Sequence, residues 1–218
     1  MGCARLQVRI LYLRQMKNIV IIGTSGVGKT FLEQELESLK ISYQLPKYTN
    51  RAPRPGEDSI KTVCISSDEF ESLSTNNDFF FTLDYGGFKY GWKRNDLLLY
   101  QNIPVTMAIT LESFEEFLSK NQNFLPILLT VDNSDLSLIE NRLYSRENIN
   151  LLPENKLSEV KLKISQRLSL AREELKQIEN YKKMVILNDG LVFFIKNDQT
   201  IFDEVIPNIK KILLATSR

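Results

Sequence analysis

The alternation of apolar and polar positions along the chain predicts strands that are separated by helices. Residues Asn18 to Ile22 form a continuous, mostly β-branched run, which is typical of a strand covered on both faces. The runs 103–109 and 124–131 have the same character, and residues 184–189, MVILND, are expected to form a further strand that ends in a turn. Strands in alternation with helices favour an α/β fold, with a parallel sheet and helices on both of its faces.

Several segments carry apolar residues at helical spacing. One follows the glycines after Ile22, the longest covers Leu157–Tyr181, and Thr200–Leu214 closes the chain. A further helix is expected to begin at a capping box formed by Ser66 and Glu69. The apolar face of the first helix would be made of Phe31, Leu32, Leu36 and Leu39, and that of the longest helix of Val160, Ile164, Leu168, Ala171, Leu175 and Ile178.

Residues 46–101 interrupt this alternation. They contain short strand candidates and a hairpin that turns at Gly86 and Gly87. We therefore expect a core made of residues 16–45 and 102–218, into which the segment 46–101 is inserted as a separate lobe.

Residues 1–15 are expected to be an extension without function in front of a single domain that covers residues 16–218. Arg9 and Arg14 interrupt the apolar run of this extension, which argues against a signal peptide and against a membrane-spanning helix. Leu6 stands where an N-myristoylation signal requires serine or threonine.

The composition excludes several classes of function. A hydrophobic content of 43% and a net charge of +1 are those of an ordinary globular protein, and they give no electrostatic reason to expect nucleic acid or a membrane as the partner. The chain has no histidine, which excludes catalysis by serine–histidine or cysteine–histidine pairs and every histidine-based metal site. Its two cysteines suggest no disulfide framework, so a reducing, cytoplasmic location is expected.

The segment GTSGVGKT matches the phosphate-binding loop pattern G-x-x-x-x-G-K-[ST] in full, between a predicted strand and a predicted helix. The glycines allow backbone N–H groups to surround a phosphate, and the start of the helix adds positive potential. Lys29 is expected to reach the β- and γ-phosphates of a nucleoside triphosphate, and the Thr30 hydroxyl to bind Mg²⁺. The expected nucleotide-binding residues are Gly23, Thr24, Ser25, Gly26, Val27, Gly28, Lys29 and Thr30.

The segment KYTNRAPRPGE holds Arg51 and Arg54 three residues apart between prolines, followed by Glu57. Such a segment is either a solvated loop or a receptor for a doubly charged oxyanion, because the arginine fork matches phosphate geometry.

The order of four segments resembles that of the guanylate kinase family: the phosphate-binding loop, then TNRAPRPGE, SSDEFESL and GGFKYG. This resemblance implies a P-loop kinase core, an acceptor-binding lobe and a helical lid over about 143–160. It also implies that ATP and Mg²⁺ are used to phosphorylate a nucleoside monophosphate. Arg51, Arg54, Glu57 and Tyr90 match the family residues around the acceptor phosphate.

Further segments extend the resemblance. NRLYSR is similar to the start of the family's lid, which implies that Arg142 and Arg146 face the phosphoryl group, and SQRLSLAREEL adds Arg167 as a third catalytic arginine. Together with Lys29 these would be the catalytic residues. The LND at 187–189 resembles a family segment near adenine, which makes Asn188 a candidate nucleotide contact.

The positions that read guanine in the family differ in this chain. Phe81 stands where the family has a glutamate, and Trp92 where it has a serine or threonine. Asp84 is near enough in sequence to serve as a substitute carboxylate. A site without hydrogen-bond partners leaves polar groups of a base unsatisfied, at about 1–3 kcal/mol each. We therefore expect Phe81 and Trp92 to form an apolar, poorly discriminating pocket.

Other departures concern charged groups. The family has acidic residues near base and metal where this chain has Ala108 and Thr110, and a serine where this chain has Lys47. The phosphate-binding positions therefore remain while several others have changed.

Three functions stay open on these grounds. The first is an ATP-dependent kinase that acts on a nucleoside monophosphate such as GMP, and the second is a sugar-phosphate kinase that resembles the ribose 1,5-bisphosphate phosphokinases. The third is a non-catalytic interaction module, against which the intact Lys29 and Thr30 argue. The expected partner is a small phosphorylated acceptor, with the chain as a monomer or homodimer.

Overall fold

The computed structural model describes residues 17–54, 56–100, 102–132, 136–147 and 153–216. The predicted extension 1–15 and residues 148–152 of the expected lid lie outside these ranges.

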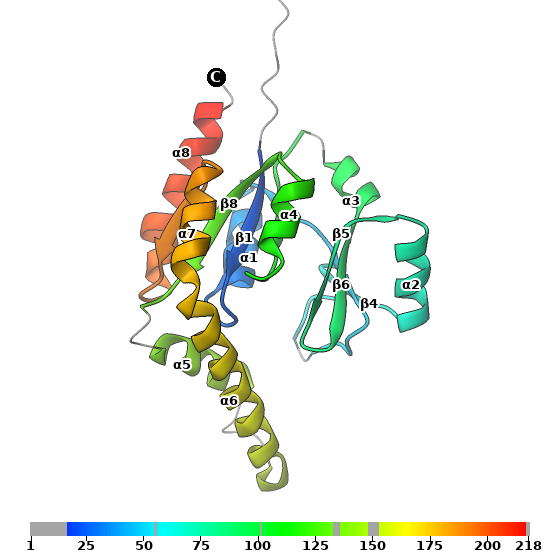
Figure 1. The fold of residues 1–218 in the computed structure, drawn as a ribbon, viewed down its shortest axis with the longest axis vertical. Helices are drawn as coiled ribbons and strands as arrows, with labels where there is room; N and C mark the ends of the chain where they lie inside the picture. The colour runs from blue at the N-terminus through cyan, green and yellow to red at the C-terminus, as the bar shows by residue number, and fades with distance from the viewer. Residues whose placement is uncertain (1–16, 55, 101, 133–135, 148–152, 217–218) are drawn as a thin grey trace, which may run out of the picture.

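A five-stranded sheet forms the centre of the molecule, and all of its strand pairs are parallel (Figure 1). Its strand order is β2-β7-β1-β8-β9. The strands are β1 (Asn18–Gly23), β2 (Tyr43–Gln44), β7 (Val105–Ala108), β8 (Phe124–Thr130) and β9 (Leu191–Phe194). Crossovers between parallel strands require intervening segments of a dozen or more residues, which explains why helices separate most of these strands in the chain.

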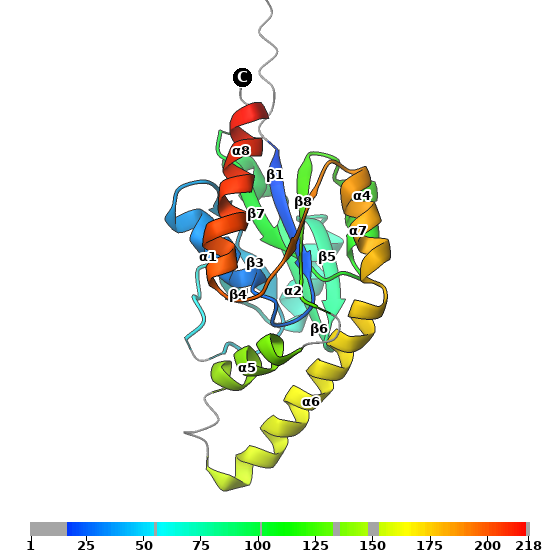
Figure 2. The same ribbon diagram turned by 90° about the vertical axis from the view of Figure 1, so that its left-hand side faces the viewer.

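Helices cover both faces of this sheet, as predicted. Figure 2 shows α1 and α8 on one side of it and α4 and α7 on the other. Their bounds are α1 (Lys29–Ser38), α4 (Phe114–Lys120), α7 (Ile178–Leu187) and α8 (Ile206–Thr216), the last of which follows one π-helical turn at Ile201–Val205.

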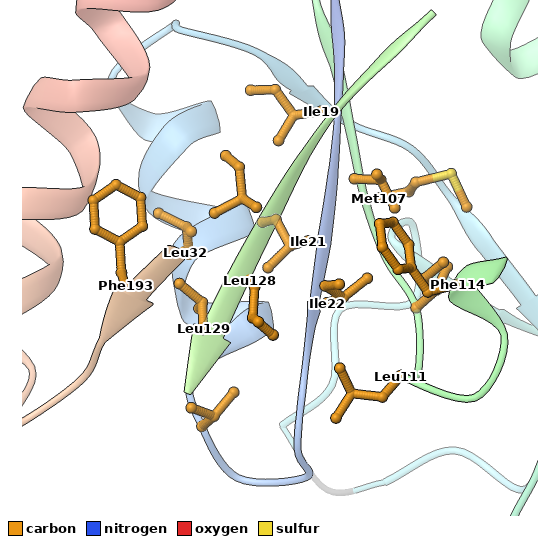
Figure 3. Packing of buried hydrophobic residues seen from close by; sticks show 14 of the residues in the cluster. Ile19, Ile21, Ile22, Leu32, Met107, Leu111, Phe114, Leu128, Leu129 and Phe193 are labelled. Atoms are coloured by element: carbon orange, nitrogen blue, oxygen red, sulfur yellow. The ribbon is translucent and has the colours of Figure 1, made fainter. Parts of the chain in front are cut away.

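The central strands are buried on both faces because the helices cover both. Ile19 to Ile22 have no exposed surface, and every residue of β8 is buried. Figure 3 shows Ile21 and Leu128 of neighbouring strands among the side chains of the core. Fully burying one such side chain contributes about 1.5–3 kcal/mol, so this layer holds the loops at the ends of the strands in place.

A second, four-stranded sheet lies to one side of the first (Figure 1). Its order is β4-β3-β6-β5, and the helices α2 and α3 accompany it. The elements are β3 (Lys47–Thr49), β4 (Thr62–Cys64), α2 (Ser67–Thr75), β5 (Phe79–Tyr85), β6 (Phe88–Lys93) and α3 (Arg94–Leu99). The segment in which the sequence predicted short strands therefore builds a sheet of its own.

Two local predictions in this segment are confirmed. The β5–β6 hairpin turns at Gly86 and Gly87, whose φ angles of 61° and 78° explain why glycine stands at both positions. Ser66 caps α2 by accepting a hydrogen bond from the backbone N–H of Glu69 at 3.1 Å.

The strand predicted at residues 184–189 is wrong. The long helix consists of α6 (Glu154–Lys176) and, after Gln177, α7, which includes the apolar run up to Leu187. Ile178 and Val185 are buried on one face of α7, whereas Leu187 is 82% exposed. This is helical burial, and a short apolar run alone does not distinguish it from a strand.

One helical position was also assigned to the wrong environment. Leu32 and Leu36 are buried as predicted, but Leu39 is 46% exposed because α1 ends at Ser38.

In the part of the chain that is described, no helix combines the length and apolar character needed to cross a membrane.

Candidate active site

The phosphate-binding loop joins the end of β1 to the start of α1, at the carboxyl edge of the parallel sheet where α/β proteins bind ligands. Gly28 precedes α1 with a φ of 108°, and a Cβ atom there would approach a guanidinium nitrogen of Arg142 to 3.2 Å. Glycine therefore suits both the backbone conformation and the close approach of the arginine.

Lys29 lies against this loop. Its ammonium group donates hydrogen bonds to the carbonyl oxygens of Gly23 and, at 2.9 Å, Thr24. Burial lowers the pKa of Lys29 to about 8, an effect opposed by the negative charges of Glu174 and Glu33. A phosphate group that approached would restore the charged form and replace these carbonyl contacts.

The acceptor loop, which follows β3 and carries Arg51, Arg54 and Glu57, holds its two arginines in different ways. Arg51 is 6% exposed and forms an ion pair with Glu57, in which both carboxylate oxygens lie 2.7 Å from the same guanidinium nitrogen. Its other terminal nitrogen donates a hydrogen bond to the carbonyl of Ala52 at 2.6 Å. The pKa of Arg54 is lowered to about 10 by burial and then by the positive charges of Arg146, Arg51 and Arg167. Cations concentrated in this way favour a bound anion.

A cavity of about 320 Å³ joins these parts. Its walls come from the phosphate-binding loop, the acceptor loop, the β5–β6 hairpin and the helices α5 (Ser137–Arg146) and α6. Of the residues predicted from the sequence, it is lined by Gly23, Ser25, Gly26, Gly28, Lys29, Thr30, Arg51, Arg54, Tyr90, Trp92, Arg142, Arg146 and Arg167.

Three of these are the predicted lid arginines. Arg142 donates to the carbonyl of Val27 at 2.7 Å and forms an ion pair with Asp198, so it contacts the back of the phosphate-binding loop. The pKa of Arg146 is lowered by burial and by the charge of Arg167, which itself lies 3.5 Å from Glu147.

Three predicted acceptor contacts, Phe81, Asp84 and Glu57, do not line the cavity. Phe81 is 3% exposed and packs in the core, with its ring centre 5.0 Å from that of Phe117. Asp84 is exposed on the opposite face of β5 from Leu83 and Tyr85, because side chains alternate along a strand. Two predicted nucleotide-binding residues, Thr24 and Val27, do not line the cavity either.

Asn188 lies far from the phosphate-binding loop. It follows α7 and precedes β9, and a carboxylate oxygen of its neighbour Asp189 is 3.9 Å from the ammonium nitrogen of Lys17, directly before β1. Because the strands are parallel, this is the amino edge of the sheet, opposite the loop. A second Asn-Asp pair, Asn197 and Asp198, follows β9 at the carboxyl edge, and the Arg142 ion pair places Asp198 beside the loop.

Several polar residues on the cavity wall were not predicted as site residues from the sequence. Glu33 of α1 is 4% exposed, accepts a hydrogen bond from the backbone of Ala108, and has its pKa raised to about 7 by burial. Lys47 of β3 also lines the cavity, and burial lowers its pKa. With Gln44 beside them, these groups show that the predicted apolar pocket is wrong. The available signal was that Glu33 lies between Leu32 and Leu36 on the buried side of a helix.

Two further missed residues contact the phosphate-binding loop through Ser25. Glu174 of α6 accepts a hydrogen bond from its backbone, and the hydroxyl of Tyr85 hydrogen-bonds with its side chain. Burial raises the pKa of both Glu174 and Tyr85. Within the described ranges, Oε2 of Glu174 has no hydrogen-bond partner.

The sequence of the chain is similar to those of several known proteins. A family profile described as "Ethanolamine utilisation - propanediol utilisation" (PduV-EutP) matches only residues 16–54, which contain the phosphate-binding loop. The chain is 30% identical over 181 residues to a protein named guanylate kinase of Mesoplasma florum, which covers 80% of this chain and 56% of that relative. It is 31% identical to the guanylate kinase of Mycoplasmopsis pulmonis, covering 73% of this chain and 81% of that relative.

The fold has a solved counterpart. The crystal structure of guanylate kinase from Anaplasma phagocytophilum superposes with a TM-score of 0.63, covering 94% of this chain and 91% of that one at 16% sequence identity. Identity this low supports the fold alone.

Proposed function

Because this chain belongs to the guanylate kinase family, we propose that it transfers the γ-phosphoryl group of ATP to the phosphate of a nucleoside monophosphate, with GMP as the first candidate. The observation that carries this proposal is one cavity that joins Lys29 of the phosphate-binding loop to Arg54 of the acceptor loop. A kinase needs such an arrangement because two anionic substrates must be held end to end.

The arginines supply the electrostatic part of the reaction. Arg142, Arg146 and Arg167 lie on the cavity wall, where their positive charge offsets the charge that develops on the oxygens of the phosphoryl group. Arg54 would bind the acceptor phosphate directly. Arg51, held by Glu57, would contact the phosphate from a fixed position.

Mg²⁺ is the expected cofactor, and the residues present fit it. Thr30 brings a hydroxyl oxygen to the cavity wall in the first turn of α1. No cluster of acidic or cysteine side chains in the described ranges forms a complete metal site, which suits an ion that takes most of its ligands from nucleotide phosphates and water. When bound, Mg²⁺ would be held in part by the Thr30 hydroxyl and would neutralise part of the charge of the nucleotide phosphates.

Phosphorylated sugars are a second class of acceptor. The burial of Phe81 away from the cavity favours this class, since no side chain from that position meets a base. A non-catalytic module is the weakest alternative, because Lys29 and the lid arginines line one cavity.

An acceptor screen tests the proposal. The full chain is incubated with ATP, Mg²⁺ and each nucleoside monophosphate or ribose 1,5-bisphosphate, and acceptor-dependent ADP formation is measured. We expect turnover with GMP and its loss in Lys29→Ala, with the melting temperature retained because the hydrogen bonds of Lys29 go to carbonyl groups of the phosphate-binding loop. Turnover with no acceptor, or undiminished turnover in Lys29→Ala, would refute the kinase function.

A further inference from the structure

We propose that Glu33 and Lys47 select the acceptor by binding the end of the molecule that lies away from its phosphate. This inference rests on the proposed kinase function and adds the groups that distinguish one acceptor from another. Both side chains line the cavity, Glu33 from α1 and Lys47 from the first position of β3.

Glu33 has unused binding capacity. Its carboxyl group is buried and accepts a hydrogen bond from the backbone of Ala108, yet none of the ion pairs among the described residues includes it. A carboxylate has room for about four hydrogen bonds. A buried polar group without enough hydrogen-bond partners lowers stability, so packing alone does not account for a carboxyl group at this position. The position therefore suits a group that meets a ligand.

Lys47 is near enough to both this carboxyl group and the phosphate-binding arginines to be affected by their charges. Burial lowers the pKa of Lys47 most, the negative charges of Glu33 and Glu57 raise it, and the positive charges of Arg51 and Arg54 lower it. The cavity is therefore strongly positive around the arginines, where a phosphate belongs. Of its two acidic wall residues, Glu174 contacts the phosphate-binding loop, whereas the carboxyl group of Glu33 is coupled most strongly to Lys47 and then to Lys29. A ligand that fits would carry its phosphate at one end and a hydrogen-bond donor at the other.

The remaining walls suit a planar ring. Trp92 and Leu45 line the same cavity as Glu33, and an aromatic ring stacks on flat groups without reading their hydrogen bonds. The carboxyl group of Glu33 would accept from a ring N–H, and the ammonium group of Lys47 would donate to an adjacent carbonyl oxygen. Bases with a ring N–H next to a carbonyl, such as guanine and hypoxanthine, satisfy both groups. Adenine presents a hydrogen-bond acceptor in place of the ring N–H and a donor in place of the carbonyl, so it does not match this arrangement.

The decisive measurement is kcat/KM for GMP, IMP and AMP in the unmodified chain, in Glu33→Gln and in Lys47→Met. Glu35→Gln on the same helix serves as the matched control, because Glu35 does not line the cavity. We expect Glu33→Gln to lower kcat/KM for GMP and IMP about tenfold or more, as for loss of a charged hydrogen bond. AMP should change less than about threefold, and the KM for ATP should stay constant. Lys47→Met should likewise lower kcat/KM for GMP and IMP.

An unchanged ratio of GMP to AMP in Glu33→Gln would overturn the proposal. So would an equal loss for all acceptors with a raised Mg²⁺ requirement, since that would assign Glu33 to the metal. Binding of GMP and AMP without ATP is measured by calorimetry on the same variants, so that the proposal is tested even if the chain turns over no acceptor. Weaker GMP binding in Glu33→Gln would then support it, and binding of neither nucleotide by the unmodified chain would overturn it.

Discussion

Replacing Glu33 by glutamine should change how the stability of the protein depends on pH. Burial raises the pKa of Glu33 from 4.5 to about 7. In the pH window between these values the folded protein holds a proton on Glu33 that the unfolded chain has released. Raising the pH through this window therefore lowers the free energy of unfolding, and the contribution of Glu33 is most favourable at or below pH 4.5.

The size of the effect follows from the two pKa values. The difference between 4.5 and about 7, at about 1.4 kcal/mol per pH unit, corresponds to about 3 kcal/mol between the ends of the window. Glutamine stays neutral throughout and keeps a similar shape. Its free energy of unfolding relative to the unmodified chain should therefore rise by about 3 kcal/mol from pH 4.5 to pH 7.

Urea unfolding at several pH values between 5 and 7 measures this difference. Glu174, whose pKa burial also raises, is present in both proteins, so its contribution cancels. If the difference between Glu33→Gln and the unmodified chain did not grow with pH, the carboxyl group would be ionised in the folded state and the burial argument would be wrong.

Two matched pairs of variants test other parts of the site. Arg54→Ala should raise the KM for the acceptor about tenfold or more, with little change in the free energy of unfolding. Arg51→Ala should raise this KM as well and should also lower the free energy of unfolding by about 2 kcal/mol, because it leaves Glu57 without its ion-pair partner. Urea unfolding separates the two, and equal stability losses would contradict the distinction. Asp198→Ala should raise the KM for ATP several-fold, because it releases Arg142 beside the phosphate-binding loop, whereas Asp189→Ala should leave this KM unchanged. Steady-state kinetics measures both values, and equal effects of the two variants would mean that the nucleotide binds elsewhere.

Features that depend on a few adjacent residues were predictable from the sequence. The phosphate-binding loop, the hairpin at Gly86 and Gly87 and the cap at Ser66 each have a local physical cause, and the last two are confirmed in the structure. The parallel sheet followed from the alternation of elements.

Features that depend on which edge or face a residue reaches were not predictable. Asn188 and Asn197 both stand in Asn-Asp pairs after apolar runs, and only the burial pattern of α7 shows which run is the strand. Phe81 and Glu33 show the same limit. The strand turns Phe81 into the core, and the packing of α1 beside Ala108 brings a carboxyl group to a wall of the cavity where no acidic residue was expected.

The two residues proposed to select the acceptor belong to different sheets. Glu33 is carried by α1, which packs on the five-stranded sheet, and Lys47 is carried by β3 of the four-stranded sheet. An acceptor that bonds to both acts as a non-covalent cross-link between the two sheets, and its binding free energy adds to that which holds them in register. Binding of such an acceptor would then also make the arrangement of the two sheets more rigid.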